Sequence, residues 1–227
     1  MAGCCKVGFE ENLIEPTVNK LLLVGASGLV GRHTLDLALA DPRVASVIAL
    51  TRRALPPHPK LTAIVVDFDR LDGQAPYWQA DAVICTLGTT MRVAGSQDAF
   101  RRVDYTYPLA VARLAREHGT PACVLNSAAG AETGSRFFYN RVKGELERDL
   151  SAQSFTSLTF VRPGLIGGKR EQFRLGERVL ETVLAVVGPL LPTAWRINPA
   201  PRIARALLDA AIDPQAGQHV VAAAQLA

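Results

Sequence analysis

The chain has 227 residues, enough for one large domain with a substantial core. Hydrophobic residues make up 48% of it and charged residues 20%, which excludes a disordered chain. The net charge is +4, but the basic residues are scattered rather than gathered in a stripe, so nucleic-acid binding is not expected.

Residues 1–18 contain no apolar run of the signal-peptide type, and we expect a loose extension ahead of a single domain over residues 19–227. Four cysteines are present without a C-x-x-C pair: Cys4, Cys5, Cys85 and Cys123. Cys85 and Cys123 lie in apolar runs, as reduced core cysteines do. This usage is typical of a reducing compartment and predicts a cytoplasmic protein.

Apolar runs alternate with amphipathic stretches along the first two thirds of the chain. The runs predicted as strands are 20–24, 44–51, 61–66, 81–87, 121–127 and 158–161, and the predicted helices are 29–40, 97–118 and 135–150. The strands are apolar throughout, so both faces of their sheet should be buried, and the alternation with helices favours parallel pairing. The sequence therefore predicts an α/β fold, a doubly wound parallel sheet of the Rossmann type.

The pattern is looser from residue 165 onward, with helices expected over 173–187 and 201–212. We expect residues 165–227 to form the substrate-side portion of the domain, a small elaboration or lid. The apolar run 183–191 is shorter than the ~20 residues of a membrane-spanning helix. It could be a lid, a dimer surface or a membrane-touching patch. A monomer and a homodimer are both compatible with the sequence.

Gly25, Gly28 and Gly31 follow the first predicted strand with the spacing G-x-x-G-x-x-G. Gly25 and Gly28 allow a sharp turn and a close approach of the backbone to a pyrophosphate, and Gly31 allows the helix to pack closely on the strand. The N–H groups at the helix start would face the anion. The strand before this turn and the amphipathic helix after it favour a dinucleotide site.

The end of the second predicted strand carries Thr51, Arg52 and Arg53. A protein that binds NAD usually has an Asp or Glu here to hold the ribose hydroxyls. Two guanidinium groups suit a 2′-phosphate instead, so we predict NADP(H) over NAD(H). In the alternative interpretation, Arg52 and Arg53 are solvated loop charges.

Tyr139 and Lys143 lie four residues apart and so on one face of a helix. An ammonium beside a phenol should lower the pKa of Tyr139, so that this side chain could exchange a proton near neutral pH. Ser127, at the end of the fifth predicted strand, could hydrogen-bond a substrate carbonyl or alkoxide. We predict Ser127, Tyr139 and Lys143 as a catalytic set.

The glycine turn and this set, together with Arg162-Pro163-Gly164, resemble the short-chain dehydrogenase/reductase superfamily in its extended or atypical branch. The sequences of residues 138–147 and 160–164 are similar to those of the Tat-interacting-protein-like group of that branch. The resemblance covers residues 20 to about 175. It implies an NADP(H)-binding Rossmann fold in which Tyr139 is the general acid/base, Ser127 orients the substrate and Lys143 holds the nicotinamide ribose.

The resemblance further implies that Asp67 meets the adenine and that Pro163 closes the nicotinamide side. The expected cofactor contacts are Gly25, Ser27, Gly28, Leu29, Val30, Gly31, Arg52, Arg53, Asp67, Phe68, Thr86, Leu87, Gly88, Tyr139, Lys143 and Pro163. The sequence departs from the family where many members have an Asn that completes a proton relay. The nearest residue here is Asp104, and the sequence leaves open whether it takes part in such a relay.

These residues predict an NADP(H)-dependent oxidoreductase that moves a hydride between the nicotinamide and a small carbonyl or alcohol. The alternative is an NADP(H)-binding regulator or scaffold with little turnover, since the Tat-interacting-protein-like group is discussed more for its protein partners. No metal site is expected, because the four histidines are dispersed.

Overall fold

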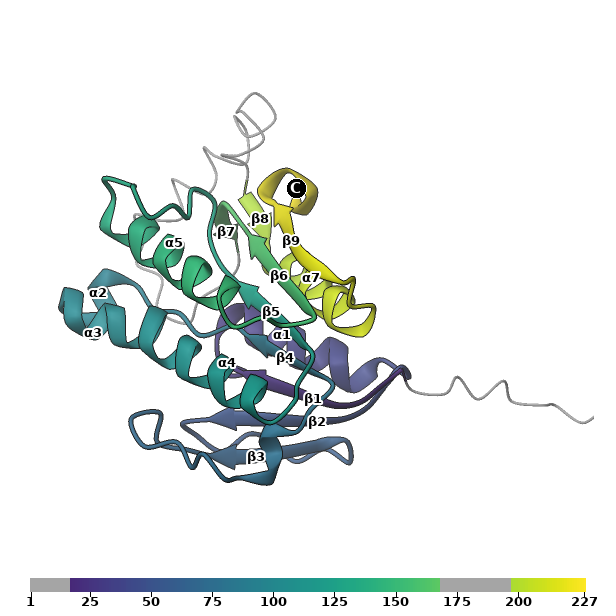
Figure 1. The fold of residues 1–227 in the computed structure, drawn as a ribbon. Helices are drawn as coiled ribbons and strands as arrows, with labels where there is room; N and C mark the ends of the chain where they lie inside the picture. Colours follow the sequence, from purple (N-terminus) through teal and green to yellow (C-terminus); the bar gives the residue numbers. More distant parts are fainter. Residues whose placement is uncertain (1–16, 168–196) are drawn as a thin grey trace, which may run out of the picture.

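The computed structural model describes residues 17–167 and 197–227. Its centre is a parallel sheet of seven strands in the order β3-β2-β1-β4-β5-β6-β9 (Figure 1). The strands are β1 (Val18–Val24), β2 (Val44–Thr51), β3 (Leu61–Val65), β4 (Ala82–Cys85), β5 (Ala122–Asn126), β6 (Ser157–Arg162) and β9 (Gly217–Ala222). The predicted doubly wound parallel sheet is confirmed. Its strand order changes direction between β1 and β4, where such sheets hold their ligands.

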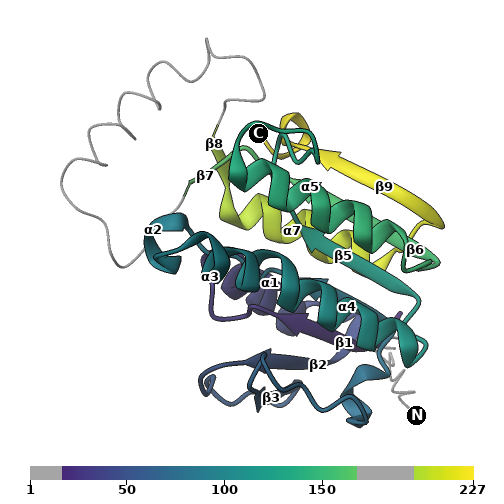
Figure 2. The same cartoon turned by 60° about the vertical axis from the view of Figure 1, so that its left-hand side comes forward.

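Helices cover both faces of the sheet (Figure 2). One face carries α1 (Leu29–Ala40) and α7 (Ala200–Ile212), and the other carries α4 (Tyr107–Glu117) and α5 (Phe138–Ser151). The shorter elements are α2 (Met91–Ala94), α3 (Gln97–Arg101) and the single turns η1 (Pro76–Trp78), η2 (Arg102–Thr106) and η5 (Ala223–Leu226).

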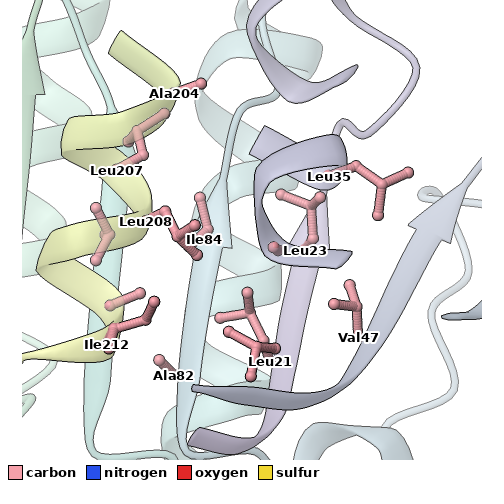
Figure 3. Close-up of a cluster of buried hydrophobic side chains, with 14 of the residues drawn as sticks. Leu21, Leu23, Leu35, Val47, Ala82, Ile84, Ala204, Leu207, Leu208 and Ile212 are labelled. Atoms are coloured by element: carbon pink, nitrogen blue, oxygen red, sulfur yellow. The ribbon is translucent and has the colours of Figure 1, made fainter. Parts of the chain in front are cut away.

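The larger hydrophobic core fills the space between the sheet and the α1–α7 layer (Figure 3). Leu21 and Leu23 of β1 point into it, while Leu22 and Val24 point into the core on the other face. All four side chains are fully buried, and each burial is worth about 1.5–3 kcal/mol. The unbroken apolar run of β1 follows from this burial on two faces.

The predicted helix 97–118 is interrupted. It forms α3, then the π-helical turn η2, then α4. Pro108 explains the interruption, because it has no N–H to donate to the carbonyl of Asp104 one α-turn earlier. The backbone N–H of Tyr107 bonds instead to the carbonyl of Arg102, five residues back. This wider turn carries Asp104, whose side chain is buried.

Residues 197–227 differ from the expected substrate-side layer. Helix α7, predicted over 201–212, packs against α1 and the sheet, and β9 extends the sheet beside β6. Strand β9 was missed because its exposed, mixed sequence gives no apolar run. Residues 1–16, the predicted helix 173–187 and the apolar run 183–191 lie outside the described residues. Val18, expected in the extension, begins β1.

A second, two-stranded sheet pairs β7 (Leu165–Gly167) with β8 (Ile197–Pro199). Asn198, the middle residue of β8, is fully buried. Its Oδ1 accepts a hydrogen bond from the Gly164 N–H at 2.7 Å, and its Nδ2 donates to the Ala223 carbonyl at 2.9 Å. One side chain thus joins β8 to the end of β6 and to η5. No helix within residues 17–167 and 197–227 combines the length and the apolar character needed to cross a membrane.

Candidate functional site

A cleft of about 580 Å³ opens where β1, β4 and β5 end, at the change of direction in the sheet. Of the predicted site residues, it is lined by Ser27, Gly28, Leu29, Val30, Arg52, Thr86, Leu87, Gly88, Ser127, Tyr139 and Lys143. Ten further lining residues were not predicted as contacts: Arg32, Thr89, Thr90, Val93, Ala94, Ala99, Val103, Asp104, Asn126 and Ile166. The cleft thus joins the glycine turn to the Tyr-Lys pair, more than 100 residues later.

The glycine turn forms one wall of the cleft. Gly25 has φ +91°, and a Cβ there would lie 2.7 Å from the backbone carbon of Thr86. A Cβ on Gly31 would lie 2.1 Å from the Gly25 carbonyl oxygen. Both glycines are therefore required by the close packing of β1, β4 and α1, and they lie beneath the cleft. Gly28 is the N-cap of α1, whose first turn holds no acidic residue. That helix end can receive an anion.

Two arginines reach the cleft beyond the glycine turn, and only one was predicted. Arg52 lines it as expected, and Arg32 of α1 joins it. Arg53 does not line it. The hydroxyl of Thr51 donates to the Arg53 carbonyl at 2.9 Å and accepts from the Arg53 N–H at 3.2 Å, which turns the chain at this point. Arg32 immediately follows Gly31, and this position next to the glycine turn could have indicated from the sequence that Arg32 lines the cleft.

Lys143 and Asp104 form a buried ion pair at the other end of the cleft. The Lys143 Nζ lies 2.9 Å from the Asp104 Oδ1, with the two side chains 3% and 1% exposed. Burial lowers the pKa of Lys143, but the Asp104 carboxylate and the Tyr139 phenol outweigh it, and the net direction is upward. The Asp104 Oδ2 accepts from the Thr89 N–H at 2.8 Å. Asp104, whose role the sequence left open, thus lines the site and pairs with Lys143.

Ser127 faces a second ion pair, in which Glu147 is buried and Arg162 is partly exposed. Its Oγ donates to the Glu147 Oε1 at 2.5 Å, and Arg162 donates to both oxygens of the same carboxylate, through Nε at 3.0 Å and through Nη2. Ser127 and Glu147 are buried. A hydroxyl has one proton, so Ser127 offers only its lone pairs to the cleft in this arrangement. A hydrogen bond from Ser127 to a substrate stays a prediction.

Tyr139 stands at the start of α5, one turn before Lys143, and is 38% exposed. Its ring meets the edge of Phe100 at 5.7 Å between centroids. Asn126 lines the cleft nearby, and its buried Oδ1 accepts no hydrogen bond from any described residue. A buried acceptor without a partner lowers stability unless a donor reaches it. Asn126 therefore favours a ligand with a hydrogen-bond donor at this point.

Three further predicted cofactor contacts, like Arg53, are not among the residues that line the cleft. The Asp67 carboxylate accepts from the Asp69 N–H at 3.0 Å in a local turn. Phe68 is buried and packs on Tyr107, with ring centroids 5.5 Å apart. Pro163 is buried, and its carbonyl accepts from the Ala129 N–H at 2.8 Å. Contact of these residues with a cofactor stays a prediction. Throughout the described ranges, no group of three or more His, Cys, Asp or Glu side chains is placed to hold a metal ion.

The comparisons with known proteins give this arrangement a class. Residues 21–146, more than half of the chain, match the NAD dependent epimerase/dehydratase family, and the chain belongs to it. Membership supports an enzyme of the short-chain dehydrogenase/reductase kind that binds a nicotinamide dinucleotide. The fold alone is also shared with MoeE5 in complex with UDP-glucose and NAD (TM-score 0.68, 17% identity, 89% of this chain and 75% of that one).

Within this class, the similar proteins include rat HTATIP2, 34% identical over 206 residues that cover 87% of this chain and 83% of that protein. The mitochondrial protein fmp52 of Aspergillus fumigatus is 35% identical over 203 residues, 84% of this chain and 86% of that protein. The predicted resemblance to the Tat-interacting-protein-like group is confirmed.

The predicted cytoplasmic location is wrong by the same comparison. The fungal relatives from Aspergillus fumigatus and Candida albicans are named as mitochondrial proteins. The prediction rested on cysteine usage. Cys85 and Cys123 are indeed free and buried, but a buried free thiol does not distinguish one reducing compartment from another.

Proposed function

We propose that the protein is an NADP(H)-dependent reductase of small carbonyl compounds. One observation carries the proposal: a single cleft joins Arg52 and Arg32 at the glycine turn to Tyr139 and Lys143 on α5. The two arginines suit a 2′-phosphate, and Tyr139 with Lys143 suits proton transfer. The cleft therefore offers groups both for binding NADPH and for protonating the reduced carbonyl. The fungal relatives also favour a mitochondrial location for this chain.

The residues of the cleft fit a phosphorylated dinucleotide. Gly28 begins α1 with backbone N–H groups and no competing side-chain cap, which suits a pyrophosphate. Arg52 can fork onto a phosphate, and Arg32 lines the same cleft. Among the described lining residues the one carboxylate is Asp104, which pairs with Lys143. Bound there, the nicotinamide would supply the hydride.

The chain's own groups divide the remaining work. Tyr139 gives its phenolic proton to the carbonyl oxygen, and Lys143 holds the positive charge beside it. Ser127 accepts a hydrogen bond, because its proton is held by Glu147. The product hydroxyl can donate its one proton either to Ser127 or to the Asn126 Oδ1, which has no hydrogen-bond partner among the described residues.

Six apolar side chains line the cleft beside the polar Thr89, Thr90 and Asn126: Leu87, Val93, Ala94, Ala99, Val103 and Ile166. Among the described residues they offer nothing to bind a sugar or a diphosphate. MoeE5, by contrast, is named in complex with UDP-glucose. We therefore propose an apolar aldehyde or ketone as substrate rather than a nucleotide sugar.

Binding and turnover test the proposal separately. Titration of the purified protein should give an NADPH dissociation constant at least ~10-fold below that for NADH. A screen of apolar aldehydes and ketones, followed by NADPH absorbance, should reveal turnover that Tyr139→Phe abolishes while NADPH binding is kept. Equal turnover by Tyr139→Phe would contradict the mechanism. NADPH binding without turnover of any probe would favour the regulator or scaffold.

A further inference from the structure

The charge that should act on Tyr139 is already compensated. Lys143 lies one helical turn after Tyr139, and the two side chains interact electrostatically. The same ammonium lies 2.9 Å from the Asp104 carboxylate, and both members of the pair are almost fully buried. A buried pair of opposite unit charges has no net charge, so its effect on a neighbouring phenol is much weaker than that of a lone ammonium.

The position of Asp104 is built into the fold. The π-helical turn η2 and Pro108 behind it bring Asp104 inward. The Thr89 N–H holds the Oδ2 at 2.8 Å, which leaves the Oδ1 for Lys143. Helix η2, the loop after β4 and helix α5 therefore all fix the carboxylate. Such wide turns in a helix are frequent at functional sites.

We propose that Asp104 is a positioning residue that keeps Tyr139 in its protonated form, so that the site is built to donate a proton and to reduce carbonyls. The direction of the reaction rests on the proposed function, while the protonation of Tyr139 does not. In the step itself, the carbonyl carbon gains the hydride of NADPH, which is oxidised to NADP+. The carbonyl oxygen gains the proton of Tyr139, and water then reprotonates the phenolate.

The other ionisable groups around the pair do not change this balance. Cys85 of β4 interacts with both Lys143 and Asp104, but burial raises the pKa of its thiol to about 11, and it is neutral at pH 7. Glu147 and Arg162 neutralise each other one turn further along α5. Arg141, two residues after Tyr139, donates to the Ser135 carbonyl instead.

The protonation of Tyr139 can be followed without a substrate. Tyrosinate absorbance is titrated in the cofactor-free protein, and the Tyr139→Phe titration is subtracted to isolate one phenol out of four. The pKa values of Tyr77, Tyr105 and Tyr107 are all raised, the first and third mainly by burial and the second by its hydrogen bond to Asp149. Their signals are common to both titrations and are removed by the subtraction.

Asp104→Asn leaves the Lys143 charge uncompensated and keeps an oxygen for the Thr89 N–H. The midpoint of the Tyr139 signal should move about one unit or more to lower pH. Asp104→Glu, which keeps the charge, and Asp98→Asn, an exposed carboxylate on α3, should leave it within a few tenths of a unit. An unmoved midpoint in Asp104→Asn would overturn the proposal.

Two further measurements keep the outcome decisive. If Asp104→Asn does not fold, the double variant Asp104→Asn/Lys143→Gln removes both charges, and its midpoint should match that of the parent; a shift of a unit would count against the proposal. With a turned-over substrate, Asp104→Asn should slow reduction near pH 7 and move its pH profile to lower pH. Failure to find any substrate would remove the proposed function and leave the titration result standing.

Discussion

The two ends of the cleft are built in different ways. The glycine end depends on backbone fit: Gly25 and Gly31 leave no room for a Cβ, and the glycine turn itself is contiguous in the chain. The α5 end depends on buried charge: Lys143 pairs with Asp104, 39 residues earlier, and Glu147 with Arg162, 15 residues later. The first end can be disturbed by one methyl group, and the second by one unbalanced charge.

The largest effect is expected from the backbone end. Gly31→Ala places a Cβ against the Gly25 carbonyl and should lower the free energy of unfolding by about 3 kcal/mol and abolish NADPH binding. Urea unfolding and NADPH titration measure the two effects. The matched control is Gly134→Ala, because a Cβ at Gly134 meets nothing within 4 Å. Similar losses of unfolding free energy and of NADPH binding in both variants would contradict the role given to close packing at Gly31.

Next in size is the loss of a buried charge partner. Arg162→Met leaves the buried Glu147 carboxylate without its cation and should cost about 3 kcal/mol of unfolding free energy. Adding Glu147→Gln should recover part of that loss, because it removes the stranded charge. A double-mutant cycle by urea unfolding measures the coupling. Additive losses would mean that the pair does not act as a unit.

A smaller effect should separate the arginines. Arg52→Gln should weaken NADPH binding about 10-fold, or about 1.4 kcal/mol, and leave NADH binding unchanged. Arg32→Gln should act in the same direction. Arg53→Gln is the control, since Arg53 does not line the cleft. A loss confined to Arg53→Gln would reverse the assignment, and equal losses for NADPH and NADH would exclude recognition of the 2′-phosphate.

The smallest effect concerns an ion pair outside the cleft. Arg43 donates to both oxygens of Asp41 at 3.0 and 2.8 Å, and these hydrogen bonds hold the pKa of Asp41 below its usual range. A lowered pKa stabilises the folded state above the usual carboxyl pKa, and this contribution is lost as the pH falls through the folded-state value. Asp41→Asn should therefore cost about 1 kcal/mol at pH 7.

Urea unfolding of the parent and Asp41→Asn at pH 7 and pH 3 measures this dependence. The difference in unfolding free energy should shrink at the lower pH as the parent carboxylate is protonated. A cost that stays constant with pH would assign the effect to packing. The half-exposed Arg43 makes this pair a useful contrast to the buried Lys143–Asp104 pair.

Sequence predicted the glycine end better than the α5 end for a physical reason. Gly25, Gly28 and the start of α1 act within a few residues, and the bounds of α1 and β2 were predicted as the structure has them. Ser127, Tyr139 and Lys143 were found as residue types, but their partners Glu147 and Asp104 belong to contacts across elements. Pro108, within the predicted helix 97–118, was the signal in the sequence. The π-helical turn that precedes it was not predicted.

The buried amide of Asn198 has a consequence for how the last part of the chain is held in place. Because Asn198 joins the end of β6 to β8 and η5, the chain leaves the sheet at Gly164 and returns at a point fixed beside it. Leu165 and Ile197 pair directly across the second sheet. Among the described residues, these contacts fix the position of β8 relative to β6 and η5. A single buried amide thus ties together three elements that lie far apart in the sequence, so its loss should loosen all three at once.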